Sequence, residues 1–286
     1  MNQSYILTLQ CTDRPGIVSA VTSHLYECGG NITEAQQFDD ATTGRFFMRL
    51  QFDLPVASSA EDRFRASLSS LAPRLGLTWR LSAANVKKRA LILVSRYDHC
   101  LADLLYRTRI GEMNMEIVGI VGNHPLESLS IEGVGRIPFH HLPVTRETKA
   151  RQEAQIRQLI ESTGAELIVL ARYMQILSDD FANYLCGRCI NIHHSFLPGF
   201  KGAQPYHQAY DRGVKIIGAT AHYVTGDLDE GPIIEQDVVH VSHADTPEIL
   251  TRKGWDVERR VLSRAVLYYL QDRVLLNGNK TVVFRS

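Results

Sequence analysis

The chain has 286 residues, a length typical of two domains or one large domain. Its 31 basic and 31 acidic residues balance, which argues against a protein that binds nucleic acid through a basic surface. No apolar run is long enough for a membrane span, and the N-terminus lacks the pattern of a signal peptide. Five scattered cysteines fit a reducing compartment, so we expect a cytoplasmic protein without a membrane partner.

The N-terminal part has the pattern of a small α/β unit. Asp13–Gly16 is a turn signal, and the glycine pair Gly29–Gly30 ends the helix that follows it. The expected strands are Tyr5–Leu9, Ile32–Phe38, Arg45–Leu54 and Thr78–Ser82, and the expected helices are Ile17–Glu27 and Ala60–Leu75. This β-α-β-β-α-β order is the ferredoxin-like arrangement, and we assign it to residues 1–84.

A second domain, residues 85–286, is expected to begin with the continuously apolar run Ala90–Ser95. Such a run is typical of a strand buried on both faces of a parallel sheet. The strands expected after it are Glu116–Val121, Leu167–Leu170, Cys189–His193, Ile216–Val224 and Ile233–Val241. The expected helices are Leu101–Arg109, Thr148–Ser162, Asp179–Tyr184, Tyr206–Arg212 and Pro247–Gln271. This alternation favours an α/β domain with a mostly parallel, Rossmann-like sheet.

Two polar side chains stand at the end of one predicted strand. Asn191 and His193 are two residues apart, so on a strand they point the same way. An amide and an imidazole on one face can stabilise the oxyanion of a reacting carbonyl group. From spacing alone, a turn-capping asparagine and a core histidine are the more common interpretation.

The loop Thr225–Pro232 follows another apolar strand and carries three carboxylates. A carboxylate beside His193 would favour the charged imidazole and fix its orientation. In isolation, a solvated acidic turn is again the more common interpretation.

Together, Asn191–His193, Ser195–Pro198 and Thr225–Ile234 resemble the folate-dependent formyltransferase superfamily, over residues 89 to about 270. The resemblance implies that Asn191, His193 and Asp229 are the catalytic residues, with Asp229 and not Asp227 at the position of the catalytic aspartate. It also implies that Leu170–Ser178 and the loop Val224–Asp229 surround the pterin. The folate contacts that it implies are Met174, Gln175, Leu177, Val224, Thr225 and Asp227.

The segment Ser95–Leu101 distinguishes members of this superfamily. Those that act on a ribonucleotide carry a glycine-rich loop here, which binds phosphate at a helix N-terminus. This chain has no glycine in the segment, and Asp98 would repel phosphate. His99 and Cys100 are therefore candidate pocket residues on the water side, although a helix start with a buried cysteine explains them equally well.

The N-terminal unit resembles an ACT domain through Cys11–Val18 and Gly29–Ile32. ACT domains often bind amino acids and pair with one another, so the resemblance implies a homotetramer or homodimer and an effector such as glycine or methionine. Asp13, Gly16 and Asn31 are the candidate effector contacts, and a purely structural role is equally well supported.

With both units, the chain resembles the formyltetrahydrofolate deformylase family over nearly its whole length. The resemblance implies hydrolysis of 10-formyltetrahydrofolate to formate and tetrahydrofolate, with formate supplied to purine synthesis and the folate acting as substrate, so no cofactor is expected. Formyl transfer to an amine and a non-enzymatic folate sensor remain the alternatives.

A metal site is not expected. Cys186 and Cys189 form a C-x-x-C pair, but no second pair or suitably spaced histidine completes a zinc site. The histidines at strand ends are more often structural than metal ligands, and His193 is better used as an acid.

Overall fold

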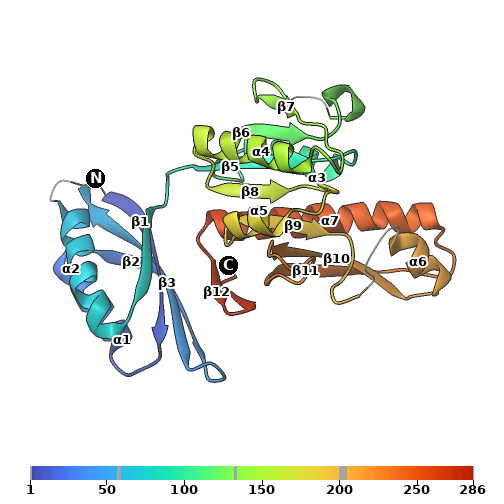
Figure 1. Ribbon diagram of the computed structural model, residues 1–286. Coiled ribbons are helices and arrows are strands. Elements are labelled where there is room, and N and C mark those ends of the chain that lie inside the picture. Colours follow the sequence, from blue (N-terminus) through green and yellow to red (C-terminus); the bar gives the residue numbers. More distant parts are fainter. Residues whose placement is uncertain (1, 57–58, 132–133, 200–204, 286) are drawn as a thin grey trace. The chain divides into compact units, whose positions relative to one another are not determined.

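The computed structural model describes residues 2–56, 59–131, 134–199 and 205–285. It divides into two compact units (Figure 1). The first contains the chain up to Val86 together with Gln271–Asn277 and the segment that begins at Val282. The second contains Lys87–Leu270 and Gly278–Thr281. The predicted fold class, a ferredoxin-like unit followed by a Rossmann-like unit, is confirmed.

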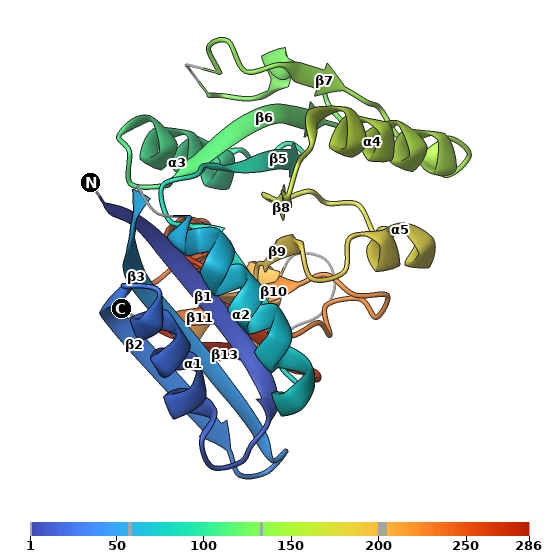
Figure 2. The ribbon, with the colours of Figure 1, turned by 90° about the vertical axis from the view of Figure 1, so that its left-hand side faces the viewer.

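The first unit is a four-stranded antiparallel sheet of order β2-β3-β1-β4, covered on one face by two helices (Figure 2). Its elements are β1 (Asn2–Thr12), α1 (Ile17–Glu27), β2 (Asn31–Asp40), β3 (Arg45–Pro55), α2 (Ala60–Leu75) and β4 (Thr78–Ala83). The core between the sheet and the helices contains Leu7, Phe52 and Phe64, none of which is exposed. Alternation of apolar residues along the strands, with period two, places Leu7 and Phe52 on this face, and Phe64 packs there from α2.

The second face of this sheet is covered by the C-terminal segment, which the sequence analysis assigned to the other domain. Leu275 on β12 (Val274–Asn277) packs with Phe284 against Phe47, which has no exposed surface. Phe47 lies on the face away from α1 and α2. Its burial requires another segment to pack on that face, and local sequence patterns do not identify this segment. A short partner strand, β13 (Lys280–Val283), completes the hairpin.

The second unit is a seven-stranded sheet of order β11-β10-β9-β8-β5-β6-β7. The strands are β5 (Lys88–Val94), β6 (Met115–Gly122), β7 (Phe139–His141), β8 (Leu167–Leu170), β9 (Cys189–His193), β10 (Ile216–Tyr223) and β11 (Ile233–His240). Pairing is parallel from β9 to β7 and antiparallel for β10 and β11. The short strand β7 was not predicted.

Helices cover both faces of this sheet (Figure 2). They are α3 (His99–Arg109), α4 (Lys149–Thr163), α5 (Asp179–Tyr184), α6 (Pro205–Asp211) and α7 (Pro247–Leu270), with a short 3₁₀ turn at Leu126–Ser128. Buried apolar residues of α4 and α5 pack on one face, and α3 and α7 pack against each other on the opposite face. Within the described residues, no helix is both long and apolar enough to cross a bilayer.

The order of the strands defines where a ligand fits. From β5 the chain proceeds through β6 to β7 on one side, and from β8 through β9 on the other. The carboxyl ends of β5 and β8 therefore adjoin at the point where the winding reverses, and ligands of open α/β sheets bind in the crevice at such a point. The end of β9, with Asn191 and His193, is the next along this edge.

Candidate active site

His193 and Asp229 form the centre of the candidate site. His193 ends β9 and is 5% exposed, and its Nδ1 lies 3.2 Å from Oδ2 of Asp229 in the loop after β10. The other ring nitrogen, Nε2, lies 2.9 Å from the hydroxyl of Ser195. A carboxylate only accepts hydrogen bonds, so Nδ1 of His193 donates to Asp229, whereas the Ser195 hydroxyl can donate or accept.

The backbone of the loop after β10 presents Asp229 to His193. Asp229 has a φ of 57°, in the left-handed region that aspartate tolerates better than most residues. At Gly231 the chain passes so close to the carbonyl of Tyr223 that a side chain would collide with it. Only glycine fits there, which explains the Gly231–Pro232 pair after the acidic residues.

The histidines beside Asp229 favour the ionised form of its carboxyl group. Burial alone would raise the pKa of its carboxyl group, but the hydrogen bond to His193 and the proximity of His222 outweigh this effect and hold the pKa well below its ordinary value. A carboxylate thus faces two imidazoles, with His222 Nε2 at 3.6 Å from Oδ1. The site therefore contains a fixed negative charge that can stabilise a cationic imidazole.

His222 is a member of this site that the sequence analysis did not assign. It lies opposite Asn191 in the pairing of β9 with β10, and it is 2% exposed. Its Nε2 lies 3.2 Å from Nδ2 of Asn191, and its Nδ1 donates to the carbonyl of Tyr223 at 2.9 Å. The alternating pattern of the predicted strand Ile216–Val224 contains His222. Only the pairing of this strand with β9 shows that the histidine faces Asn191.

A cavity of about 320 Å³ opens in front of these residues. It is lined by Asn191, His193 and Asp229, and also by all six predicted folate contacts: Met174, Gln175, Leu177, Val224, Thr225 and Asp227. Met174 is 50% exposed, and its backbone N–H donates to the hydroxyl of Ser95 at 3.0 Å, which fixes the start of the segment after β8. Polar groups thus converge at one end of a pocket that has apolar side chains along its length, as expected for a heterocyclic ligand.

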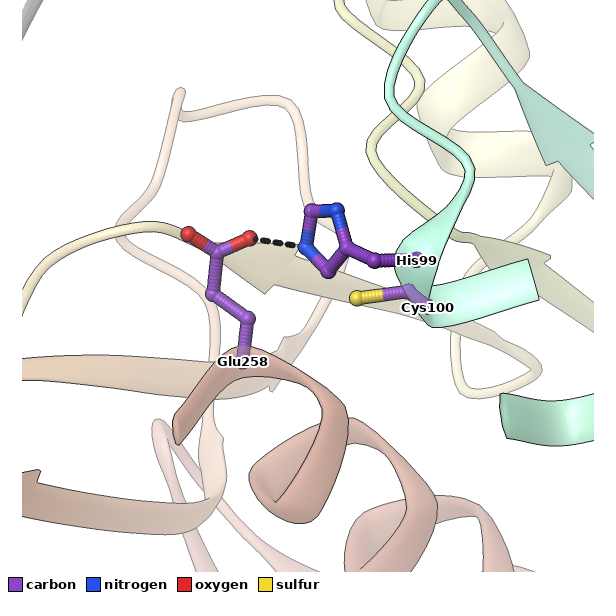
Figure 3. Close-up of side chains that lie close together, drawn as sticks. All are labelled: His99, Cys100 and Glu258. Atoms are coloured by element: carbon purple, nitrogen blue, oxygen red, sulfur yellow. Dashed lines mark hydrogen bonds and ion pairs between the residues drawn. The ribbon is translucent and has the colours of Figure 1, made fainter. Parts of the chain in front are cut away.

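His99 and Cys100 are not among the residues that line this cavity in the described part of the chain. They begin α3 and point toward Glu258 of α7 (Figure 3). The three side chains offer ligand atoms within 4.8 Å of one another, a spacing compatible with a metal ion. However, the Glu258 oxygens already accept hydrogen bonds from His99 and Tyr206, so each oxygen has a protein donor.

The candidate effector residues lie in the first unit. Asp13 and Asn31 are both exposed. Asp13 directly follows β1, and Asn31 is the first residue of β2. Gly16 has a φ of 93° and precedes α1, a conformation that glycine adopts without strain. Within the described residues no hydrogen bond joins the three, and their role as effector contacts stays a prediction.

Comparisons with known proteins agree with this architecture. Residues 88–266 match the family model for formyl transferases, and residues 3–82 match the model for an ACT domain. The chain is 50% identical over 281 residues to a formyltetrahydrofolate deformylase of Corynebacterium sp. (strain P-1), with 98% of each chain covered. Together, the fold and the residues at the end of β9 define a protein of the formyl transferase class.

Solved structures identify the family more closely. A crystal structure of formyltetrahydrofolate deformylase from Burkholderia mallei superposes with a TM-score of 0.91, at 48% identity, and covers 99% of this chain and 100% of that one. A glycinamide ribonucleotide transformylase from Symbiobacterium toebii has a TM-score of 0.63 at 27% identity, and covers 70% of this chain and 95% of that one. The chain belongs to the formyltetrahydrofolate deformylase family.

Proposed function

We propose that this protein hydrolyses 10-formyltetrahydrofolate to formate and tetrahydrofolate. The observation that supports this proposal best is the convergence of Asn191, His193 and Asp229 at the end of a cavity that the predicted folate contacts also line. The near full-length similarity to formyltetrahydrofolate deformylases supports water as the acceptor. The reaction would release formate for purine synthesis and balance the one-carbon pools, in the cytoplasm.

We propose a mechanism in which these three residues act together. Water attacks the formyl carbon on N10, and the developing oxyanion accepts hydrogen bonds from the Asn191 amide and the protonated His193. Asp229 stabilises the charged imidazole and orients the water or accepts its proton. The bond between carbon and N10 then breaks, N10 takes a proton from His193 or through water, and formate leaves.

The decisive experiment incubates the purified protein with 10-formyltetrahydrofolate and no acceptor. Stoichiometric release of formate and tetrahydrofolate supports the hydrolase. Turnover only after an amine is added would instead indicate a formyltransferase, and binding without turnover would indicate a folate sensor.

The first unit is proposed to regulate and assemble the enzyme. Its similarity to ACT domains supports a homotetramer or homodimer and an amino-acid effector, with glycine and methionine as the candidates and Asp13, Gly16 and Asn31 as the contacts. Light scattering tests the assembly, since a single chain mass in solution would contradict it. Titration of each amino acid into the hydrolysis assay tests the effector.

A further inference from the structure

The crevice where the winding of the second sheet reverses is filled by side chains. Such crevices usually hold ligand. Here the segment after β5 contributes His99, the segment after β8 contributes Arg172, and α7 contributes Glu258 from one face of the sheet. The three are in contact: Glu258 accepts a hydrogen bond from His99 at 2.8 Å and pairs with Arg172 at 3.4 Å. We call His99, Arg172, Tyr206 and Glu258 the acceptor-side wall.

Glu258 is the centre of this wall. It has no exposed surface, and its second oxygen accepts a hydrogen bond from the Tyr206 hydroxyl at 2.5 Å. Burial would raise the pKa of Glu258, but the hydrogen bond from His99 and the charge of Arg172 hold it below its ordinary value. Each oxygen thus already has a protein partner, so an incoming ammonium group would compete with His99, Arg172 and Tyr206 for this carboxylate.

The wall borders the cavity through Arg172. Arg172 and His194 line the cavity, and His194 lies beside both His193 and Tyr206, with ring centroids 5.1 and 6.5 Å apart. Away from the cavity, the His99 ring stacks on Trp255 at 5.1 Å, with 16° between the ring planes. A continuous series of contacts therefore leads away from His193, through His194, Tyr206 and Glu258 to His99.

Arg172 is held in this wall at a cost in backbone strain. Its φ is 62°, a left-handed conformation that is unfavourable for a residue other than glycine. Its carbonyl accepts a hydrogen bond from the Ser95 N–H at 3.3 Å, and its side chain is 6% exposed. Glycine would adopt this backbone without strain. The presence of arginine, despite the strain, indicates that its side chain has a role here.

We propose that the acceptor-side wall makes water the nucleophile, by filling the space that an amine would need and by occupying the carboxylate that would hold it. His99 and Arg172 are then specificity-determining residues. This inference rests on the proposed hydrolysis of 10-formyltetrahydrofolate. In the competing reaction, an amine nitrogen attacks the formyl carbon, the bond to N10 breaks, N10 takes the proton that the amine loses, and a formamide forms in place of formate.

The test measures how formyl groups divide between water and an added amine. Wild type, His99→Ala and Arg172→Gly are each incubated with 10-formyltetrahydrofolate and either hydroxylamine or glycinamide, and formate and the formylated amine are quantified. We expect the fraction of formyl groups transferred to the amine to rise about tenfold or more in both variants. A change in pocket size alters discrimination between two substrates on this scale. The ratio is independent of how much total activity a variant retains.

Two variants serve as controls. His99→Gln keeps a donor for Glu258 and most of the volume, so its ratio should stay near that of the wild type. His243→Ala removes an exposed histidine of the same unit and should also leave the ratio unchanged. An unchanged ratio in both His99→Ala and Arg172→Gly would overturn the wall as a determinant of specificity, whereas a wild type that releases no formate would instead overturn the proposed hydrolysis.

Discussion

The side-chain nitrogen of Asn191 lies 3.2 Å from Nε2 of His222, across the antiparallel pairing of β9 and β10. Nδ1 of His222 faces the carbonyl of Tyr223, which can only accept, so in the tautomer with the ring proton on Nδ1 the Nε2 atom accepts one N–H of the Asn191 amide. The second N–H of that amide is then available to the formyl oxygen. His222 thus orients the oxyanion donor.

Replacing His222 by Phe should therefore impair catalysis without preventing folding. The ring shape is kept, but Asn191 loses the acceptor that orients it and Asp229 loses one of its two imidazole neighbours. We expect kcat to fall roughly 10²-fold, the cost typical of a misplaced catalytic group, with KM nearly unchanged. Steady-state kinetics checks this, and His222→Gln, which retains an acceptor, should recover part of the loss. Wild-type kcat in His222→Phe would rule out the orienting role.

Substitution of the catalytic candidates gives a sharper expectation. Asn191→Ala and His193→Ala each remove an oxyanion donor and should lower kcat by at least about 10²–10³-fold. Asp229→Asn should be severely impaired while still binding folate, because its carboxylate faces the two histidines and not the length of the pocket. Single-turnover assays and equilibrium folate binding separate the two effects. Near-wild-type turnover in any of the three would remove that residue from the mechanism.

Most elements of the fold follow from local patterns in the sequence. The strands Leu167–Leu170 and Cys189–His193 and the helix Asp179–Tyr184 have the predicted bounds, because each is an apolar or capped segment with clear ends. The strand Phe139–His141 was missed because it is three residues long and has no alternating pattern. The return of Leu275 to the first unit was missed because it depends on packing against Phe47, which lies on a distant strand.

The candidate site was predictable only in part. The motifs place Asn191 and His193 at the end of one strand and Asp229 in the loop after another, and the structure brings the three together. No sequence pattern indicates that Glu258, inside a long helix, is fully buried, or that Arg172 adopts a left-handed backbone. Both features arise from contacts between segments that are far apart in the chain, so only the assembled sheet reveals them.

His194 should make stability depend on pH. Burial, the charge of Arg172 and the neighbouring His193 lower its pKa from 6.5 to about 4. Above pH 6.5 the residue is neutral in both the folded and unfolded states and has no effect; between pH 6.5 and 4 only the unfolded state binds the proton, so stability falls as pH falls. At pH 5 the loss should be about 2 kcal/mol relative to pH 7.

Denaturant unfolding of wild type and His194→Gln at pH 7 and pH 5 measures this loss. The glutamine variant does not titrate at this position, so its free energy of unfolding should fall less between the two pH values. Equal pH dependence of the two proteins would show that the imidazole is not kept neutral by its surroundings.

Removal of metal ions should leave hydrolysis unchanged. In the cluster of His99, Cys100 and Glu258, the carboxylate is held by protein donors, and burial raises the pKa of the Cys100 thiol well above its ordinary value, which disfavours a thiolate ligand. Activity after prolonged dialysis against a strong chelator should equal that of the untreated enzyme, with chelator-free dialysis as the control. Loss of activity that added zinc restores would contradict this.

Gly254→Ala should destabilise the protein even though alanine favours helices. In an exposed helix the change would stabilise by roughly 1 kcal/mol. Gly254 is buried in α7, however, and a methyl group there would collide with the ring of Tyr206, so overpacking of about 1–3 kcal/mol should dominate. Thermal unfolding should show a lower Tm. A double-mutant cycle identifies the cause, because in a Tyr206→Ala background the collision is absent and Gly254→Ala should become neutral or stabilising. Destabilisation that persists in that background would mean that the helix, and not the ring of Tyr206, requires the glycine.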